Sequence, residues 1–293
     1  MKLRFFTLFL SLFTFLVTFA QSDDFGFDFS LGADKKLRPG THLFIDGGVR
    51  TMDHTKKVDR WSVGLGLSQR LYTNGTFELK TGLKWEYMWV NAPEQTKDKT
   101  EEHKIEHWGI DENEEEYSYT TDDYYGYNHR YQCWRGRHRT TLSLGASYNP
   151  NKRWSFSLRE AVQYSHYNRT TTRIDRYLID EVEEDDDGNI DKERSTYTLD
   201  PDHTKVFRAK DKFLLRTKLG VDYNIRHCPI DPYVSAEYGC GLNYKGNKWK
   251  FTAGTDIKIG KQHKIDLFYR YQTEDDDDDP NGHIIGLGYN FKF

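Results

Sequence analysis

The sequence predicts an all-β fold, an antiparallel up-and-down transmembrane β-barrel. Three observations support this fold class. Apolar and polar residues alternate along most of the chain. The connections between the alternating runs are short and long by turns along the sequence, and aromatic residues cluster near the ends of the runs. Together these features are typical of a barrel whose outer face meets lipid and whose lumen is polar.

The alternation is clearest in residues 248–259, where Trp249 and Phe251 alternate with Lys248 and Lys250. Successive side chains of a strand point to opposite faces, so each such run has one apolar and one polar face. In a membrane barrel the apolar stripe faces acyl chains and the charged stripe faces the lumen. A soluble barrel or sandwich is the alternative, and it would place the apolar stripe in the core.

Eleven runs of the chain show this pattern. In chain order they are residues 25–32, 43–50, 61–68, 77–89, 140–149, 154–166, 211–224, 232–242, 248–260, 264–272 and 283–293. Several are long enough for a tilted strand to cross the hydrocarbon of a bilayer. Because bacterial single-chain barrels have an even number of strands, we expect twelve strands, with ten as the alternative.

Aromatic residues lie mostly near the ends of these runs. They include Trp61, Trp85, Trp89, Tyr148, Trp154, Tyr164, Tyr223, Trp249, Tyr269, Tyr271 and Tyr289. Rings with an apolar body and a polar edge belong at the membrane surface, where they form girdles.

The connections between the runs alternate strictly in size. Short, turn-like segments lie at residues 35–40, 72–76, 149–153, 226–231 and 260–264. The longer ones lie near 52–60, 91–132, 168–209, 243–247 and 273–282. This asymmetry predicts short periplasmic turns and long extracellular loops.

The two longest loops carry most of the acidic and aromatic residues outside the runs. Residues 101–134 mix carboxylates with Tyr and Trp, a combination that suits an extracellular glycan or a protein ligand. The alternative is a β-hairpin that lengthens the barrel wall, and the flanks of residues 185–189 favour a second such hairpin.

Composition excludes several other classes of protein. The 293 residues are 30% charged and have a mean hydropathy of −0.86, which excludes a bundle of membrane helices. One uninterrupted apolar run, residues 5–19, follows Lys2 and Arg4 and precedes Ala20. That layout predicts a signal peptide over residues 1–20, cleaved after Ala20, and a barrel domain over residues 21–293. A formal net charge of −4 gives no reason to expect nucleic acid as a partner.

The last run, residues 283–293, ends on Phe293 and resembles the terminal strand of Gram-negative outer-membrane barrels. That resemblance implies recognition by the barrel-assembly machinery. From Arg60 to its end the chain also resembles an outer-membrane family, domain of unknown function 2490. The stretches that carry the resemblance are residues 61–87, 232–243, 264–275 and 283–291, in which Pro232, Tyr233 and Glu237 are the most distinctive.

The family resemblance implies a fold and a location but no activity. It places the protein in the outer membrane of a Gram-negative bacterium, in contact with outer-membrane lipid and lipopolysaccharide.

The predicted lumen face carries charges of both signs. We expect a charge network there that includes Lys84, Glu86, Arg159, Arg216, Lys218, Glu237, Lys250, Asp256 and Arg270. With about twelve strands the interior is little wider than its side chains. Ion pairs that fill a narrow lumen are therefore favoured over a selective pore or a binding cavity, with Glu237 in a structural ion pair.

Residues 165–173 invite an enzymatic interpretation, because outer-membrane phospholipases use His and Ser at the lipid boundary. A nucleophile and its base must reach each other, so on one strand they need the same face. Ser165 and His166 are adjacent and point to opposite faces, and Asn168 stands two residues after His166. We therefore predict no catalytic residues and no resident cofactor.

Two acidic runs, residues 181–191 and 274–282, suggest weak binding of calcium through Asp185, Asp187, Asp276 and Asp278. The first run partly matches an EF-hand loop, but Arg194 occupies the position of the bidentate Glu. Solvated hairpin tips are the favoured interpretation.

Three functions follow from these features. The first is an outer-membrane barrel that serves envelope structure or binds an extracellular ligand or partner through acidic, aromatic loops. The alternative is a narrow channel for small polar solutes, and the third is an outer-membrane enzyme that modifies lipid.

Overall fold

The computed structural model describes residues 24–110, 116–181, 191–274 and 282–293. The predicted signal peptide lies outside this range. The chain divides into two compact units, which we call the barrel unit (Met1–Val90, Arg135–Asn168 and Ala209–Phe293) and the hairpin unit (Asn91–Trp134 and Arg169–Arg208). Within the described residues, no helix is long and apolar enough to cross a membrane.

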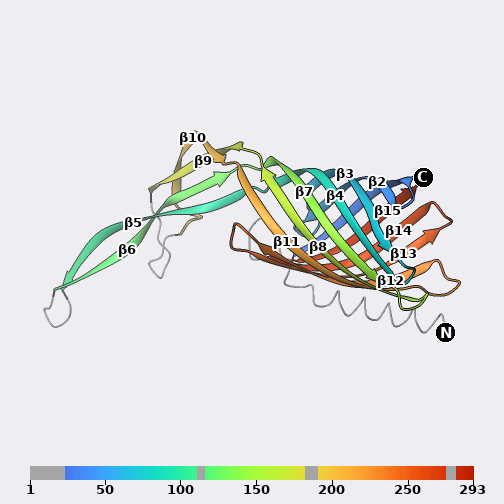
Figure 1. Ribbon diagram of the computed structural model, residues 1–293. Helices are drawn as coiled ribbons and strands as arrows, with labels where there is room; N and C mark the ends of the chain where they lie inside the picture. The colour runs from blue at the N-terminus through green and yellow to red at the C-terminus, as the bar shows by residue number, and fades with distance from the viewer. Residues whose placement is uncertain (1–23, 111–115, 182–190, 275–281) are drawn as a thin grey trace. The chain divides into compact units, whose positions relative to one another are not determined.

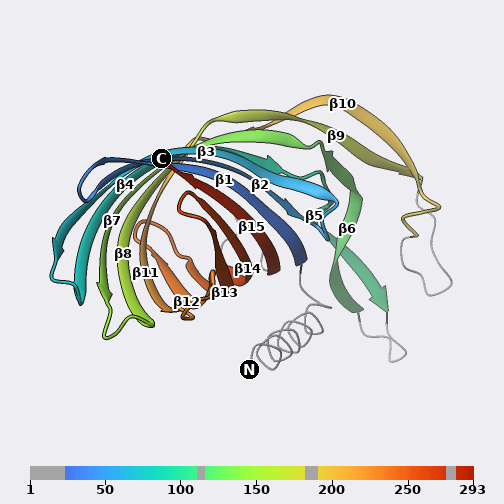
Figure 2. The ribbon, with the colours of Figure 1, turned by 90° about the vertical axis from the view of Figure 1, so that its right-hand side faces the viewer.

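The described part of the barrel unit forms a closed barrel of eleven strands (Figure 1). They are β1 (Asp24–Arg38), β2 (Thr41–Met52), β3 (Lys57–Thr73), β4 (Phe77–Ala92), β7 (Cys133–Tyr148), β8 (Trp154–Tyr167), β11 (Lys210–Tyr223), β12 (Ile230–Gly241), β13 (Asn247–Ile259), β14 (His263–Glu274) and β15 (Gly282–Lys292). Their order around the barrel is β1-β15-β14-β13-β12-β11-β8-β7-β4-β3-β2. Figure 2 shows β4, β7, β8 and β11 side by side.

The expected strand number of twelve, or ten, is wrong for this barrel. Each of the eleven alternating runs forms one strand of the described structure, and β1 lies beside β15 as a parallel neighbour. The register places Asp24 opposite Gly282 and Asp34 opposite Lys292. Since the two edge strands pair along this whole length, their backbone groups are satisfied and no further strand is needed to close the sheet.

The two longest connections leave the same end of the barrel, but the expected strict alternation of connection lengths is wrong. The loop-end connection between β2 and β3 has four residues (53–56), whereas the turn-end connection between β11 and β12 has six (224–229). Short turns follow β1, β3, β7, β11 and β13, and we call that side the turn end and the opposite side the loop end. Gly40 and Gly75 adopt φ values of +87° and +86° in two of these turns, a region that favours glycine. The carboxamide oxygens of Asn74 and Asn151 accept hydrogen bonds from backbone N–H groups two and three residues later, which tightens two turns.

The described residues of the two longest connections form two antiparallel strand pairs, which agrees with the hairpin interpretation, while their lengthening of the barrel wall stays a prediction. They contain β5 (Gln95–Ile110), β6 (Glu116–Arg130), β9 (Thr170–Glu181) and β10 (Thr196–Phe207). The sequence did not predict that these hairpins pair with each other, through β6 and β9, into one sheet of order β10-β9-β6-β5. At that junction the rings of Tyr127 and Tyr177 stack with centroids 4.6 Å apart.

The two faces of the barrel wall have opposite character. Large apolar side chains point outward, and Leu219 and Phe251 are 57% and 47% exposed. Charged side chains point into the lumen, where Glu237 is 8% exposed. Glycines on the lumen face leave room for inward rings: a Cβ on Gly286 would fall 1.9 Å from Cζ of Phe268. The barrel therefore has a polar interior and an apolar exterior.

Candidate functional site

Glu237 on β12 is the centre of a charge network in the lumen. Its carboxylate accepts hydrogen bonds from Arg216 Nη2 at 2.8 Å and Nε at 3.1 Å. Arg159 and Lys250 approach it at 3.7 Å and 4.0 Å. The strand register explains this geometry, because Lys250 of β13 lies directly opposite Glu237 and Arg216 lies on the adjacent β11. Such fork-like contacts to a carboxylate are among the strongest hydrogen bonds in proteins.

A second network joins β2, β4 and β7. The ammonium group of Lys84 donates hydrogen bonds of 2.8 Å to both Asp46 and Glu86. Arg139 lies 3.7 Å from the same Glu86 carboxylate. These contacts connect β2, β4 and β7 through the lumen face, across the intervening β3.

Asp28 connects the strands on both sides of the parallel seam. Its Oδ2 lies 3.1 Å from Arg50 on β2 and 3.5 Å from Arg270 on β14. Because β15 lies between β1 and β14, the contact with Arg270 crosses the seam itself. One carboxylate thus ties together strands from the beginning and the end of the chain.

The turn end of the lumen is richer in carboxylates. Asp256 pairs with Lys264 at 2.7 Å, and Asp231 pairs with Lys258. The hydroxyl of Tyr233 donates a 2.8 Å hydrogen bond to Asp266.

All nine residues of the expected charge network belong to barrel strands. Six of them lie in the two networks around Glu237 and Lys84: Lys84, Glu86, Arg159, Arg216, Glu237 and Lys250. Asp256 and Arg270 pair elsewhere, and Lys218 lines the same central cavity as Glu237. That these charges fill the lumen, rather than line a pathway through it, stays a prediction.

The lumen contains cavities between these networks. A central cavity of about 660 Å³ is lined by Arg159, Lys218 and Glu237, among others. A second cavity of about 680 Å³ lies at the turn end and is lined by Asp222 and Asp231. Toward the loop end the space narrows to a cavity of about 70 Å³.

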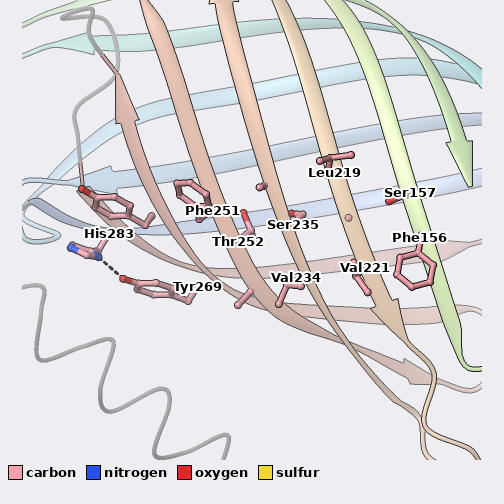
Figure 3. A pocket seen from close by; sticks show the side chains of 14 residues that line it. Phe156, Ser157, Leu219, Val221, Val234, Ser235, Phe251, Thr252, Tyr269 and His283 are labelled. Carbon is pink, nitrogen blue, oxygen red and sulfur yellow. Dashed lines mark hydrogen bonds between the residues drawn. The ribbon is translucent and has the colours of Figure 1, made fainter.

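The outer face has a shallow apolar groove of about 910 Å³. Figure 3 shows Phe251, Val234, Val221 and Phe156 along it on neighbouring strands. The polar contact drawn there is the hydrogen bond between Tyr269 and His283 (Figure 3). The groove thus offers apolar surface, interrupted by one Tyr–His pair.

Ser165 and His166 lie on opposite faces, as predicted. Ser165 is 2% exposed and accepts a 3.3 Å hydrogen bond from Gln163. His166 instead contacts Asp211 at 2.7 Å, on the other face of the strand. Alternation along the sequence does not reveal this His–Asp pair. Strands β8 and β11 are adjacent in the barrel but are separated in the sequence by the β9–β10 hairpin.

The four candidate calcium residues, Asp185, Asp187, Asp276 and Asp278, lie outside the described residues. Among the residues that the structure describes, no group of three or more His, Cys, Asp or Glu is placed to hold a metal ion.

The fold and the site define a closed β-barrel with an apolar exterior and a charged lumen. A family model described as "Protein of unknown function (DUF2490)" matches residues 25–283, so the chain belongs to this family. No curated protein matches the chain.

Nine solved protein chains are similar to this one, among them the following two. The beta domain of the Bordetella autotransporter BrkA is 12% identical with a TM-score of 0.39, and the match covers 87% of this chain and 82% of that one. The CymD monoaromatic hydrocarbon channel is 10% identical with a TM-score of 0.24, covering 85% and 82%. Similarities this low carry no argument about function.

Proposed function

We propose that the protein is an outer-membrane β-barrel of a Gram-negative bacterium, with its turn end in the periplasm and its hairpin unit outside the cell. It serves envelope structure and the binding of an extracellular ligand. The observation that carries the proposal is the apolar outer face, with side chains such as Leu65, Leu142, Leu219 and Phe251 at 47–58% exposure. In water, apolar patches of this extent drive association, whereas acyl chains cover them at no such cost.

Aromatic pairs at both ends of the outer face support the membrane location. Trp154 and Tyr223 lie 4.7 Å apart at the turn end, and Tyr238 and Trp249 lie 4.7 Å apart near the loop end. Along β8, Trp154 and Tyr164 are ten residues apart (164 − 154), which for a tilted strand is about 25 Å. That height matches the apolar band of outer-membrane barrels.

The hairpin unit supplies the surface for a glycan or protein ligand. Beside the stacked pair of Tyr127 and Tyr177, the ring of Tyr197 meets Tyr127 edge-on at 5.2 Å. Partial burial raises the pKa of Tyr127 above its ordinary value, which already keeps the hydroxyl protonated and able to donate at physiological pH. Aromatic faces beside hydroxyl donors suit both sugars and proteins. Two further partners are proposed: lipopolysaccharide at the loop end, and the barrel-assembly machinery, which would recognise β15.

The membrane location is tested by a matched pair of substitutions in the full-length chain, expressed in a Gram-negative host. Phe251→Lys places a charge on the outer face, whereas Thr252→Lys places the same charge on the lumen face. A lysine at the centre of a lipid face costs about 2–4 kcal/mol. We expect wild type and Thr252→Lys in the outer-membrane fraction as heat-modifiable bands, and Phe251→Lys depleted from it. Wild-type protein in the soluble periplasmic fraction would refute the proposal.

A narrow channel for small polar solutes is the second candidate, favoured by the central cavity of about 660 Å³ and the turn-end cavity of about 680 Å³. Conductance of the purified protein in planar bilayers separates the two candidates. Steady ohmic steps would establish a channel, and silent membranes that contain folded protein would support a closed lumen.

A further inference from the structure

The loop-end cavity of about 70 Å³ is enclosed by cationic side chains, and we call it the basic chamber. Eight of its thirteen lining residues are Arg or Lys, and none is Asp or Glu. Six of the lining residues lie on strands β2, β7, β8 and β11: Arg50, Arg137, Arg139, Gln163, Ser165 and Arg216. Strands far apart in the sequence thus converge on one positively charged space.

Five of the eight cations have carboxylate partners around the chamber: Arg50 with Asp28, Arg60 with Asp59, Arg139 with Glu86, and both Arg216 and Lys250 with Glu237. Arg50 pairs with Asp28 at 3.1 Å, and Arg216 pairs with Glu237 at 2.8 Å. Asp28 and Glu237 also each lie near a second or third cation, as Asp28 lies near Arg270. The carboxylates therefore compensate the positive charge only in part.

Arg137 shows this shortage of compensating negative charge most directly. Its side chain is 4% exposed, and its guanidinium lies 4.8 Å from the centre of the Tyr167 ring. None of the described carboxylates pairs with it, and its buried Nε has no hydrogen-bond acceptor. The buried Nε of Arg50 also has no acceptor. A buried charge without a counterion is expensive, so unpaired buried donors in a native protein point to a bound partner.

Neutral polar groups complete the chamber. Arg216 Nη1 donates a 3.0 Å hydrogen bond to the carboxamide oxygen of Gln163, which orients the amide nitrogen toward Ser165. Guanidinium, amide and hydroxyl donors together match the acceptor oxygens of a tetrahedral oxyanion. Because one water needs about 10–15 Å³ of such volume, the chamber has room for a few waters or one small oxyanion.

We propose that the basic chamber binds a small tetrahedral oxyanion of the phosphate type. The anion neutralises Arg137 and joins β2, β7 and β11 at the loop end of the lumen. This site goes beyond the proposed envelope role and depends only on a folded barrel, so it stands or falls separately from the membrane location.

The test uses the full-length protein folded in detergent micelles, titrated with inorganic phosphate by calorimetry at ionic strength fixed with potassium chloride. We expect saturable binding at one site per chain and a higher melting temperature with phosphate. Arg137→Gln should weaken binding at least tenfold, whereas Arg226→Gln, an exposed arginine at the turn end, should not change it. Arg137→Lys keeps the charge without the fork and should bind with intermediate affinity.

Absence of saturable phosphate binding to the wild type would overturn the proposal, whatever the variants do. Equal affinity in wild type and Arg137→Gln, or equal effects of phosphate and chloride, would overturn it as well. A parallel titration uses glycerol 3-phosphate, which carries the same phosphoryl group on a larger molecule. Binding of phosphate alone indicates a free oxyanion, and comparable binding of glycerol 3-phosphate indicates the phosphoryl group of a larger molecule.

Discussion

Thr217 and Glu160 form a hydrogen bond on the apolar outer face of the barrel. The Thr217 hydroxyl donates to Glu160 Oε2 at 2.9 Å, and the two residues lie directly opposite each other on β11 and β8. The next outward positions on β8 are Leu158 and Val162, both exposed. A carboxylate therefore lies within the surface that we assign to acyl chains, satisfied by one neighbouring hydroxyl.

This position predicts that Glu160→Leu stabilises the barrel in a bilayer. An acidic side chain on a lipid face costs less than the 2–4 kcal/mol of a lysine, so we expect a gain on the order of 1 kcal/mol. Urea unfolding in phospholipid vesicles measures it, with Glu160→Gln as the variant that keeps the shape and the hydrogen bond. Loss of stability in Glu160→Leu would show instead that the carboxylate has a partner in the membrane.

The Glu237 network predicts a large effect from a small change. Glu237→Gln leaves the half-buried Arg216 and Lys250 without their counter-charge, and breaking a buried ion pair costs about 3–5 kcal/mol. The free energy of unfolding in micelles should fall by that order. Glu193→Gln in the exposed part of the hairpin unit is the matched control and should leave it unchanged. Equal stability of Glu237→Gln and wild type would mean that other lumen contacts hold these strands.

Asp175 predicts a pH dependence for the hairpin unit. Arg173 donates hydrogen bonds of 2.7 Å and 3.0 Å to its carboxylate, and the Tyr131 hydroxyl donates another of 2.7 Å. The hydrogen bonds from Arg173, which have the largest effect, and the hydrogen bond from Tyr131 hold the pKa of Asp175 below its usual value. A lowered folded pKa adds stability above the unfolded value of about 3.9, and this stability is lost as the pH falls through the folded pKa.

Near-ultraviolet circular dichroism of the full chain, followed downward from pH 6, measures this transition. The wild-type signal of the hairpin unit should weaken as the pH falls below about 4, because the stability from Asp175 declines below its unfolded pKa and is lost once the pH passes its lower folded pKa. Asp175→Asn should show a smaller change over the same range and a lower stability at pH 7. Identical pH profiles for the two proteins would exclude Asp175 as the titrating group.

Local pattern predicted the strands well, because the two-residue period of a strand is visible in the sequence itself. Trp249 and Phe251, which alternate with Lys248 and Lys250, lie on the outer face that this alternation predicts. Closure of the barrel could not be predicted this way, since Phe29 and Leu287 are neighbours through a pairing of the two ends of the chain.

The basic chamber was missed for a related reason. Arg137 and Arg139 belong to a stretch, residues 135–139, in which no apolar residue alternates with the charges. Their inward direction follows from pairing with β8, where Arg137 lies opposite Tyr167. Only the register of several strands brings Arg50 and Arg216 to the same place.

Gly126 predicts the strongest backbone effect in the hairpin unit. It has a φ of +127°, and a Cβ there would lie 1.8 Å from the backbone oxygen of Tyr177. Gly126→Ala must therefore separate β6 from β9, where Gly126 lies opposite Leu178. Gly75→Ala is the control, because its φ is also positive but no atom lies within 4 Å of its Cβ position.

Hydrogen exchange of the full chain measures the separation of the two hairpins. In Gly126→Ala the amides of residues 126–130 and 174–178 should lose protection, while the barrel strands keep theirs. Gly75→Ala should lose only the stability that a strained φ costs, about 1–3 kcal/mol, with no change in the hairpin unit. Unchanged protection of residues 126–130 in Gly126→Ala would show that β6 and β9 hold together without the close approach at this glycine.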